Sequence, residues 1–213
     1  MKPISELKDI HKGYDLYVVA SGASAGYIEP SFFDNKIAIG VNQVWKRFNK
    51  LDYIVRKEGR WMDAAQTASK SMGFKLIVSQ YNCGTYSFAQ NKAGDYFFNH
   101  VDNGLKEVCL DVVGTNWIVV SFSTITSAMH IAAYMGAANI ILVGHDCGTL
   151  DGQVNFPGYG EAIGGATFYR EFITQIEPQT LALRERLKEV YNVNVYSLNP
   201  FLNFGLEGHE YER

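Results

Sequence analysis

The stretch TITSAMHIAAYMGAANIILVGHD, residues 124–146, predicts a helix that leads directly into a buried strand. Small apolar residues let the helix lie close to a sheet, and the run NIILVG at 139–144 has the length and composition of a strand. The head of the helix is crowded with hydroxyl side chains, at Ser123, Thr124, Thr126 and Ser127. One hydroxyl suffices to cap a helix, so the excess predicts a site where the first turn meets an anionic ligand.

Apolar runs of strand length recur along the chain and alternate with helical stretches. The runs cover residues 15–20, 36–41, 51–55, 74–80, 116–121, 139–144 and 194–198. Near-continuous apolar strands are typical of a parallel sheet, because helices cover both of its faces. Helices are expected at 42–49, at 60–73 and from Thr167 onward, the last interrupted near Pro178. The sequence therefore predicts one α/β domain over residues 1–213, Rossmann-like, with a mostly parallel twisted sheet and helices on both faces.

Two segments break this pattern of strands and helices. Residues 81–115 and 146–165 are rich in glycine, and the first also carries many aromatic side chains. Long glycine-rich excursions inside a compact domain are often loops that cover a site. Both segments are therefore predicted to be irregular and lid-like.

Composition excludes several classes of partner. With a formal net charge of −3 and a pI near 5.9, the chain lacks the basic surface that binds nucleic acids or anionic membranes. The polar N-terminus does not read as a signal peptide, and polar residues interrupt every long apolar stretch. Cys83, Cys109 and Cys147 are odd in number and widely spaced, which is typical of reduced thiols. We expect a cytoplasmic protein without a nucleic-acid partner or stable membrane insertion; a homo-oligomer is compatible with these features.

Polar residues follow the first two predicted strands at their carboxyl ends. The turn SGASAG comes after the first strand, and its Gly22 and Ser24 can offer backbone N–H groups and a hydroxyl to a phosphate. Asn42 comes directly after the second strand and can contact a nucleoside. Ligands of open α/β sheets bind beyond the carboxyl ends of the strands, which favours both roles. The alternative for each residue is simple helix capping.

A further polar cluster ends the strand that follows the quoted helix. Gly144, His145 and Asp146 lie at its carboxyl end, where His145 and Asp146 can act as an acid/base pair. The alternative is that Asp146 anchors the following loop through backbone N–H groups. Tyr159 and Tyr169 can meet a substrate phosphate or sugar, or else pack beneath the loop. No second His/Cys cluster has the spacing of a zinc site, so no metal ligands are predicted.

Taken in order, SGASAGYI, VNQ, ITSAMHIAAYMGAANIILVGHD and LKEVYNVNVYSLNP resemble a known superfamily. They are similar to the bacterial sialyltransferases with a single modified Rossmann domain. They also resemble the related motility accessory factors and 6-hydroxymethylpterin diphosphokinase-like proteins. The resemblance covers most of the chain apart from the two irregular segments.

The resemblance implies that a nucleotide or nucleotide-sugar binds at the carboxyl edge of the sheet. Gly22 and Ser24 would lie at its phosphate, and Asn42 would contact the nucleotide. The helix start, through Thr126 and Ser127, would meet ribose or phosphate. The carboxylate at position 146 would organise the site beside the second irregular segment.

The leading hypothesis is glycosyl transfer from a nucleotide-sugar of the CMP type to a glycan or small-molecule acceptor, without a metal. His145 is the acid/base candidate, followed by Tyr159 and Tyr169. One alternative is a magnesium-dependent phosphoryl- or diphosphoryl-transferase that needs Asp146. The other is a non-catalytic nucleotide-binding protein, because residues 164–178, where these sialyltransferases carry a histidine base, contain no histidine.

Overall fold

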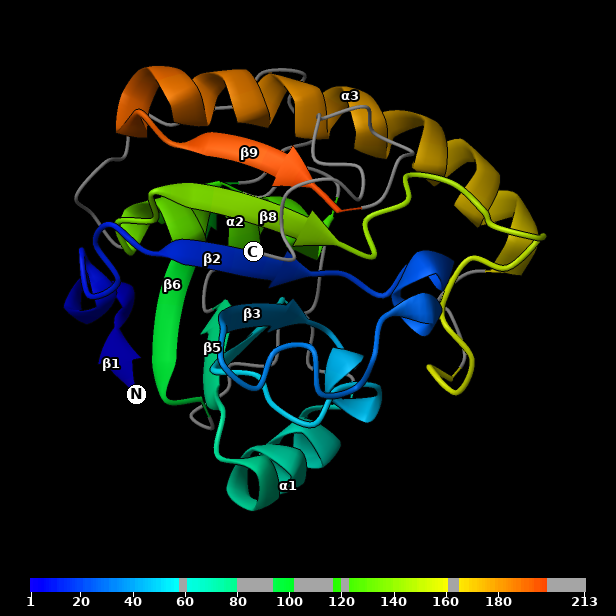
Figure 1. The fold of residues 1–213 in the computed structure, drawn as a ribbon, viewed down its shortest axis with the longest axis horizontal. Coiled ribbons are helices and arrows are strands. Elements are labelled where there is room, and N and C mark those ends of the chain that lie inside the picture. Colours follow the sequence, from blue (N-terminus) through cyan, green and yellow to red (C-terminus); the bar gives the residue numbers. More distant parts are fainter. Residues whose placement is uncertain (58–60, 80–93, 102–116, 120–122, 161–164, 199–213) are drawn as a thin grey trace.

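A parallel sheet forms the centre of the molecule (Figure 1). The computed structural model describes residues 1–57, 61–79, 94–101, 117–119, 123–160 and 165–198. The described strands follow the order β1-β6-β5-β4-β3-β2-β8-β9, with β7 paired to β6, and all of these pairings are parallel. The strands are β1 (Lys2–Pro3), β2 (Asp15–Val19), β3 (Ile37–Val41), β4 (Tyr53–Arg56), β5 (Lys75–Ser79), β6 (Tyr96–Val101), β7 (Trp117–Val119), β8 (Asn139–Val143) and β9 (Asn194–Ser197).

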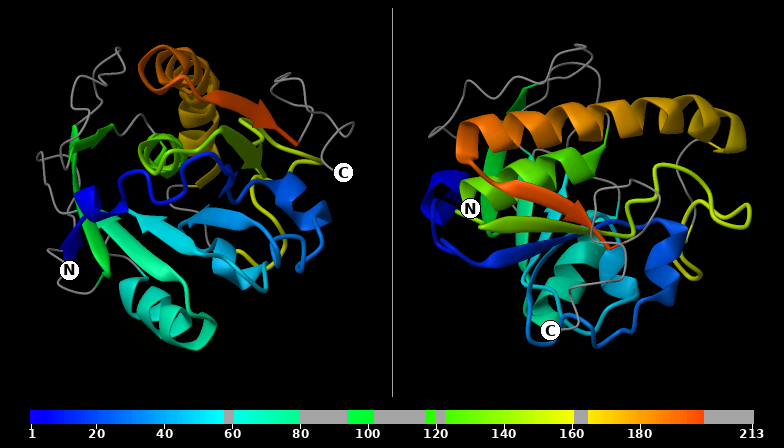
Figure 2. Two further views of the ribbon diagram at one scale, coloured as in Figure 1. Left: turned by 60° about the vertical axis from the view of Figure 1, so that its left-hand side comes forward. Right: turned by 45° about the horizontal axis from the view of Figure 1, so that its top comes forward.

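Helices and 3-10 turns cover both faces of this sheet. On one face α2 and α3 pack over β2, β3 and β8, and on the other α1 lies with η2 and η3 (Figures 1 and 2). This arrangement confirms the predicted Rossmann-like α/β architecture. None of the helices in the described ranges combines the length and apolar character needed to cross a membrane. The helical elements are η1 (Ile4–Leu7), η2 (Ala23–Tyr27), η3 (Val44–Lys46), α1 (Met62–Met72), α2 (Thr124–Tyr134) and α3 (Gly165–Tyr191).

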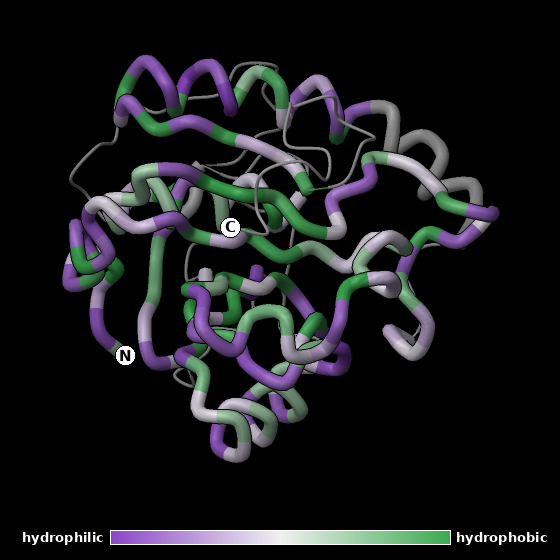
Figure 3. The backbone as a smooth tube through the Cα atoms, viewed as in Figure 1, coloured by the Kyte–Doolittle hydropathy of each residue, from purple (hydrophilic) through white to green (hydrophobic). Residues whose placement is uncertain are grey.

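The central strands are apolar because both of their faces are buried. In β2, Leu16 and Val18 face the core under α2 and α3, whereas Tyr17 and Val19 face the opposite core. Figure 3 shows the same property as hydrophobic colour along the middle of the sheet. Alternate side chains of one strand point to opposite faces, so a strand between two helical layers must be apolar throughout. This burial explains why the strands were readable from sequence.

Two helix expectations were wrong in detail. The stretch 42–49 forms only the short 3-10 turn η3, after Asn42 adopts a left-handed conformation with φ +54°. Helix α3 is not interrupted at Pro178 but continues through it (Figure 1). A proline removes one backbone donor from a helix, and packing of the flanking turns against a core can offset that loss. Leu183 and Leu187 of α3 are fully buried and supply such packing.

The predicted irregular segments have different outcomes. Residues 81–115 include a regular strand, β6, which pairs with β5, β1 and β7; 81–93 and 102–115 lie outside the described residues. The strand was not predicted, because its sequence YFFNHV lacks the Val/Ile pattern of the other strands and lies in a glycine-rich segment. Residues 146–160 are irregular as predicted, with isolated bridges but no helix or extended strand. The remaining residues of that segment, up to 164, are not described.

The chain reverses its direction across the sheet between β2 and β8. Strands β3 to β6 are added in sequence on one side of β2, whereas β8 and β9 lie on the other side. Such a switch point leaves a crevice beyond the carboxyl ends of the two central strands, where ligands bind in open α/β sheets. Here it brings together the connections that follow β2 and β8, beside the one that follows β3.

Candidate functional site

Two glycines let the connections after β2 and β8 touch. The Gly22 N–H donates to the Gly144 carbonyl oxygen at 2.8 Å. A Cβ at Gly22 would lie 2.7 Å from Asp146 Oδ2, and a Cβ at Gly144 would lie 2.7 Å from the Ala20 carbonyl oxygen. Gly144 also has a φ of +66°, which side chains disfavour. Both glycines therefore have a structural role at the switch point, and their contact with a nucleotide stays a prediction.

Asp146 binds the turn that the sequence assigns to a phosphate. Its Oδ2 accepts a hydrogen bond from the Ser24 N–H at 2.8 Å, and its Oδ1 accepts one from the Ser24 hydroxyl. Only 8% of Asp146 is exposed. Hydrogen bonds to a buried carboxylate are stronger than those between neutral groups. Asp146 thus joins the β8 connection to turn η2, and its role at a ligand stays a prediction.

Arg47 holds the other end of the same turn. Its Nε donates to the Ala25 carbonyl at 3.3 Å, and Nη2 donates to the carbonyls of Gly26 and Ile28 at 2.9 and 2.6 Å. Turn η2 is therefore fixed between a carboxylate at its head and a guanidinium at its tail. Sequence reasoning missed Arg47, because an arginine after a short turn carries no motif and its acceptors come from another connection.

The loop after β8 is fastened to the connection after β3. The buried Tyr159 hydroxyl donates to Oε1 of buried Gln43 at 2.9 Å, and Lys46 Nζ donates to the Tyr159 carbonyl at 2.8 Å. The Ser21 hydroxyl donates to Asn155 Oδ1 at 3.0 Å, which links the loop to β2 as well. We call the three interlinked connections the frame: residues 20–28, 42–47 and 144–160.

Asn42 is a half-buried polar residue of the frame. Its N–H donates to the Val55 carbonyl at 3.2 Å, and its left-handed backbone suits asparagine better than most residues. The residue is half-buried, and the described part of the chain provides no hydrogen-bond partner for its side-chain amide. Asn42 does not cap a helix, since Gln43 occupies the N-cap position of η3. Its predicted contact with a nucleoside stays untested.

The hydroxyls at the head of α2 divide into two groups. Ser123 accepts a hydrogen bond from the Ile125 N–H at 3.4 Å, and Thr126 Oγ1 donates to the Ser123 carbonyl at 2.7 Å. Ser127 is fully buried, and its Oγ has no hydrogen-bond partner within the described ranges. An unpaired buried hydroxyl costs about 1–3 kcal/mol. The cap therefore uses Ser123 and Thr126, whereas Ser127 keeps an unused hydrogen-bonding group.

His145, at the carboxyl end of β8, is hydrogen-bonded to a residue of α3. Its Nε2 is 2.8 Å from Thr180 Oγ1 and 3.5 Å from Cys147 Sγ. Because Thr180 Oγ1 donates to the Ile176 carbonyl at 2.9 Å, we assign the ring proton to Nε2, which leaves Nδ1 as the basic atom. Burial lowers the pKa of His145 to about 4, so the imidazole is neutral at pH 7.

The remaining predicted residues add little to this geometry. Tyr169 belongs to α3, but its side chain lies outside the described part of the structure. Among the described residues, no three His, Cys, Asp or Glu side chains are grouped to hold a metal ion. The frame and the head of α2 thus contain all the predicted site residues whose side chains are described.

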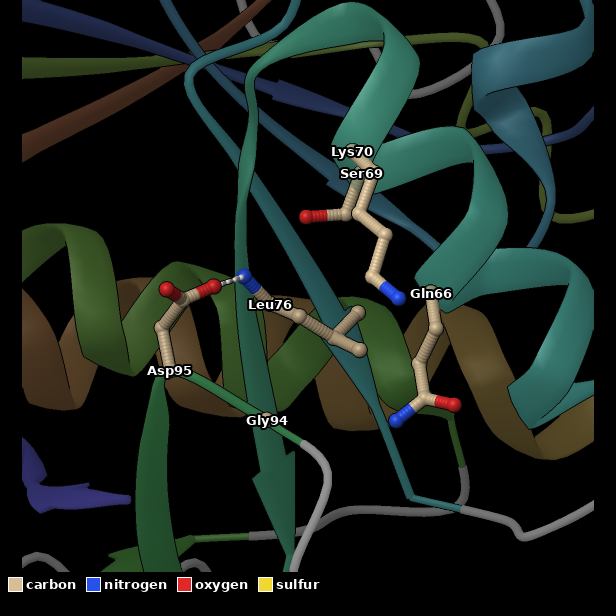
Figure 4. A pocket seen from close by; sticks show the side chains of 6 residues that line it. All are labelled: Gln66, Ser69, Lys70, Leu76, Gly94 and Asp95. Atoms are coloured by element: carbon tan, nitrogen blue, oxygen red, sulfur yellow. Dashed lines mark hydrogen bonds between the residues drawn. The ribbon is translucent and has the colours of Figure 1, made fainter.

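A cavity of about 200 Å³ lies away from this edge, between α1 and the amino end of β5 (Figure 4). Two of the polar groups around it are engaged within the fold: the Ser69 hydroxyl donates to the Phe74 carbonyl at 2.7 Å, and Asp95 Oδ2 accepts from the Leu76 N–H at 2.8 Å. The cavity is therefore separate from the predicted nucleotide edge. Its lining residues are Gln66, Ser69, Lys70, Leu76, Gly94 and Asp95.

The sequence matches no protein-family model and no curated protein. Its structure is similar to that of the sialyltransferase CstII from Campylobacter jejuni, solved in complex with the substrate analogue cytidine-5'-monophosphate. The TM-score is 0.52 at 11% sequence identity, with 91% of this chain and 84% of the other covered. A second CstII structure, in complex with CMP-3FNeuAc, has a TM-score of 0.51 at 12% identity, covering 90% and 84%.

The monofunctional alpha-2,3-sialyltransferase Cst-I from Campylobacter jejuni is also similar. Its TM-score is 0.51 at 16% identity, with 87% of this chain and 76% of that chain covered. The likeness extends over most of each molecule, although the sequence identities are low. The resemblance to motility accessory factors stays a prediction. This chain and these solved structures thus share a Rossmann-like α/β fold.

Proposed function

We propose that this chain is a nucleotide-sugar-dependent glycosyltransferase of the sialyltransferase type, which binds a CMP-type nucleotide at the carboxyl edge of its sheet. The observation that carries the proposal is the buried Ser127 hydroxyl without a partner, at the head of α2. A ligand oxygen at this hydroxyl would remove the penalty of an unpaired buried group. The fold supports the choice of ligand, because CstII has been solved with CMP and with CMP-3FNeuAc.

The other contacts of the nucleotide follow from the remaining polar groups of the edge. We assign the open Asn42 amide to the nucleoside, since it can both donate and accept hydrogen bonds. Thr126 joins Ser127 at ribose or phosphate from the first turn of α2. The backbone around Gly22, Ser24 and Gly144 borders the phosphate. The frame fixes these groups before the ligand arrives, which is the arrangement that stabilises developing charge in a transition state.

In the proposed reaction an acceptor hydroxyl attacks the anomeric carbon of the donor sugar. The bond from that carbon to the phosphate oxygen breaks, CMP leaves, and the hydroxyl proton passes to a base. We assign the base to His145 Nδ1, because Nε2 is bonded to Thr180. With a pKa near 4 the imidazole is neutral and able to accept a proton at pH 7, although it is a weak base. Tyr159 and Tyr169 remain candidates for the leaving phosphate.

One observation favours a second candidate, a nucleotide-binding protein without catalysis. Asp146, His145 and Tyr159 are each hydrogen-bonded inside the fold, to Ser24, Thr180 and Gln43. Groups that serve the fold in this way need not serve a reaction. The two candidates share the nucleotide site and differ in whether a bound CMP-sugar is cleaved.

Ligand binding is tested by thermal unfolding with CMP, UDP and ATP, each with and without magnesium. CMP at a hundredfold excess over its dissociation constant should stabilise the protein by about 2.7 kcal/mol, with no need for magnesium. Ser127→Ala and Asn42→Gly should each weaken CMP binding about tenfold, glycine being chosen because it tolerates the left-handed backbone. Ser71→Ala, on an exposed turn of α1, is the matched control. A magnesium-dependent shift with ATP would instead favour phosphoryl transfer.

Catalysis is tested separately, by CMP release from a CMP-sugar. Transfer predicts release that His145→Gln slows without weakening CMP binding. Binding of CMP without any release from CMP-sugars, with and without glycoside acceptors, would favour the non-catalytic candidate. No stabilisation by any of the three nucleotides would remove the site itself.

A further inference from the structure

An exposed tryptophan stands at the carboxyl edge beside the frame. Trp61 precedes α1 and is 43% exposed, whereas Trp45 is buried. Its backbone has a φ of +63°, a conformation in which glycine or asparagine is favoured and a bulky residue is uncommon. The indole is therefore partly exposed beside the frame, at a backbone conformation that bulky residues seldom adopt.

A lysine of the frame lies next to the indole. Lys46 Nζ is 5.8 Å from the centroid of the Trp61 ring, and its hydrogen bond to the Tyr159 carbonyl fixes its position. An ammonium has three N–H donors, and the described residues supply it with one acceptor. Gly160 has a φ of +105°, and a Cβ there would lie only 3.3 Å from Lys46 Nζ. The absence of a side chain at Gly160 leaves room beside the ammonium.

We infer that Trp61 and Lys46 form a binding subsite for a pyranoside, the acceptor of the transfer reaction. The C–H groups on one face of a sugar ring pack well on an indole face, and a neighbouring ammonium donates hydrogen bonds to the ring's hydroxyl oxygens. The subsite belongs to the connections after β3 and β4, on the same edge as Asn42. The role of the glycoside as the acceptor rests on the proposed function, whereas glycoside binding at Trp61 does not.

The test is saturation-transfer difference NMR on the full chain, with methyl β-D-galactopyranoside as the probe. We expect saturation concentrated on the ring protons of one face of the sugar. Trp61→Asn should weaken glycoside binding about tenfold. Asparagine is chosen because it tolerates the left-handed backbone, so the variant should remain folded. Trp61→Phe should restore part of the affinity, because the smaller ring still stacks. Lys46→Met should weaken binding about threefold.

Tyr14→Ala is the matched control, because Tyr14 is 63% exposed but precedes β2 at the opposite edge of the sheet. It should leave the glycoside signal unchanged. No glycoside signal with the wild-type chain, or a signal that Trp61→Asn leaves intact, would overturn the subsite. CMP binding, measured on the same samples by thermal unfolding, should be unaffected by Trp61→Asn. Glycoside binding without CMP binding would contradict the proposed function and leave the subsite standing.

Discussion

The frame and the head of α2 meet at the same edge of the sheet but differ in how their polar groups are satisfied. In the frame, Asp146, Arg47 and Tyr159 each form hydrogen bonds that link one connection to another. At the head of α2, Ser127 is fully buried with a hydroxyl that the described residues leave unpaired. The polar groups of the frame therefore stabilise the fold, whereas the Ser127 hydroxyl is available for a ligand.

The difference separates residues that build the site from residues that can bind. A group that already has a hydrogen-bond partner inside the fold contributes to stability before any ligand arrives. A buried group without a partner gains a hydrogen bond when the ligand arrives. The comparison predicts that substitutions of the hydrogen-bonded frame residues lower stability, whereas Ser127 affects binding.

The largest effect is expected for Asp146. Asp146→Ala removes the acceptor of the Ser24 N–H and hydroxyl and should lower the free energy of unfolding by about 3 kcal/mol. Urea unfolding measures it. Asp146→Asn keeps one carbonyl oxygen and should lose less. If Asp146→Ala unfolds at the wild-type urea concentration, the frame does not hold the switch point together.

The next largest effect is a pH dependence of stability caused by His145 of the frame, and His130 of the core provides the comparison. Burial lowers the pKa of His145 from 6.5 to about 4, so the unfolded chain binds a proton more tightly between these values. The stability due to neutral His145 is present above pH 6.5 and is lost as the pH falls toward 4. Between pH 7 and pH 5 the loss should be about 2 kcal/mol.

His145→Gln keeps a donor for Thr180 and should flatten this dependence, as measured by urea unfolding at pH 7, 6 and 5. His130 provides the comparison within the core: it is fully buried in α2, bonded to Tyr191, and its pKa is lowered to about 3. An unchanged pH slope in His145→Gln, together with a flattened slope in His130→Gln, would mean that His145 is not buried as a neutral group.

A smaller effect is expected where the loop joins η3. Tyr159→Phe removes the hydrogen bond to Gln43 Oε1 and should lower the free energy of unfolding by about 1 kcal/mol. A double-mutant cycle with Gln43→Leu isolates the pair, since the second substitution should cost little once the first is made. Additive losses would show that the two side chains do not stabilise one another.

The sheet could be predicted because its cause is local to each strand. Burial on both faces makes most positions of β2, β3, β4, β5 and β8 apolar, and this pattern is visible in the sequence. Strand β6 was missed because its Asn99 and His100 interrupt an aromatic run among glycines. The interruption predicted at Pro178 followed from local preference alone, whereas tertiary packing keeps α3 continuous.

The site was predictable in position but not in pairing. Gly22, Ser24 and Asp146 lie in the connections after β2 and β8, and Asn42 lies in the connection after β3, at the edge where the carboxyl-edge rule places ligands. Which groups bind one another depends on contacts between distant parts of the chain. No spacing in the sequence indicates that Thr180 reaches His145. Nor does any spacing indicate that the frame is held together by the side chains of Gln43, Lys46, Arg47 and Asn155.

The smallest expected effect on stability is a difference between substitutions of two neighbouring residues, Thr126 and Ser127. Thr126→Val removes a hydroxyl that donates to the Ser123 carbonyl and should lower the free energy of unfolding by about 1 kcal/mol. Ser127→Ala removes a hydroxyl without a partner, so the free protein should keep its stability or gain up to about 1 kcal/mol. Urea unfolding of the ligand-free protein measures both. A loss in Ser127→Ala as large as that in Thr126→Val would mean that Ser127 already has a partner in the free protein, and the site would then have no open group at the head of α2.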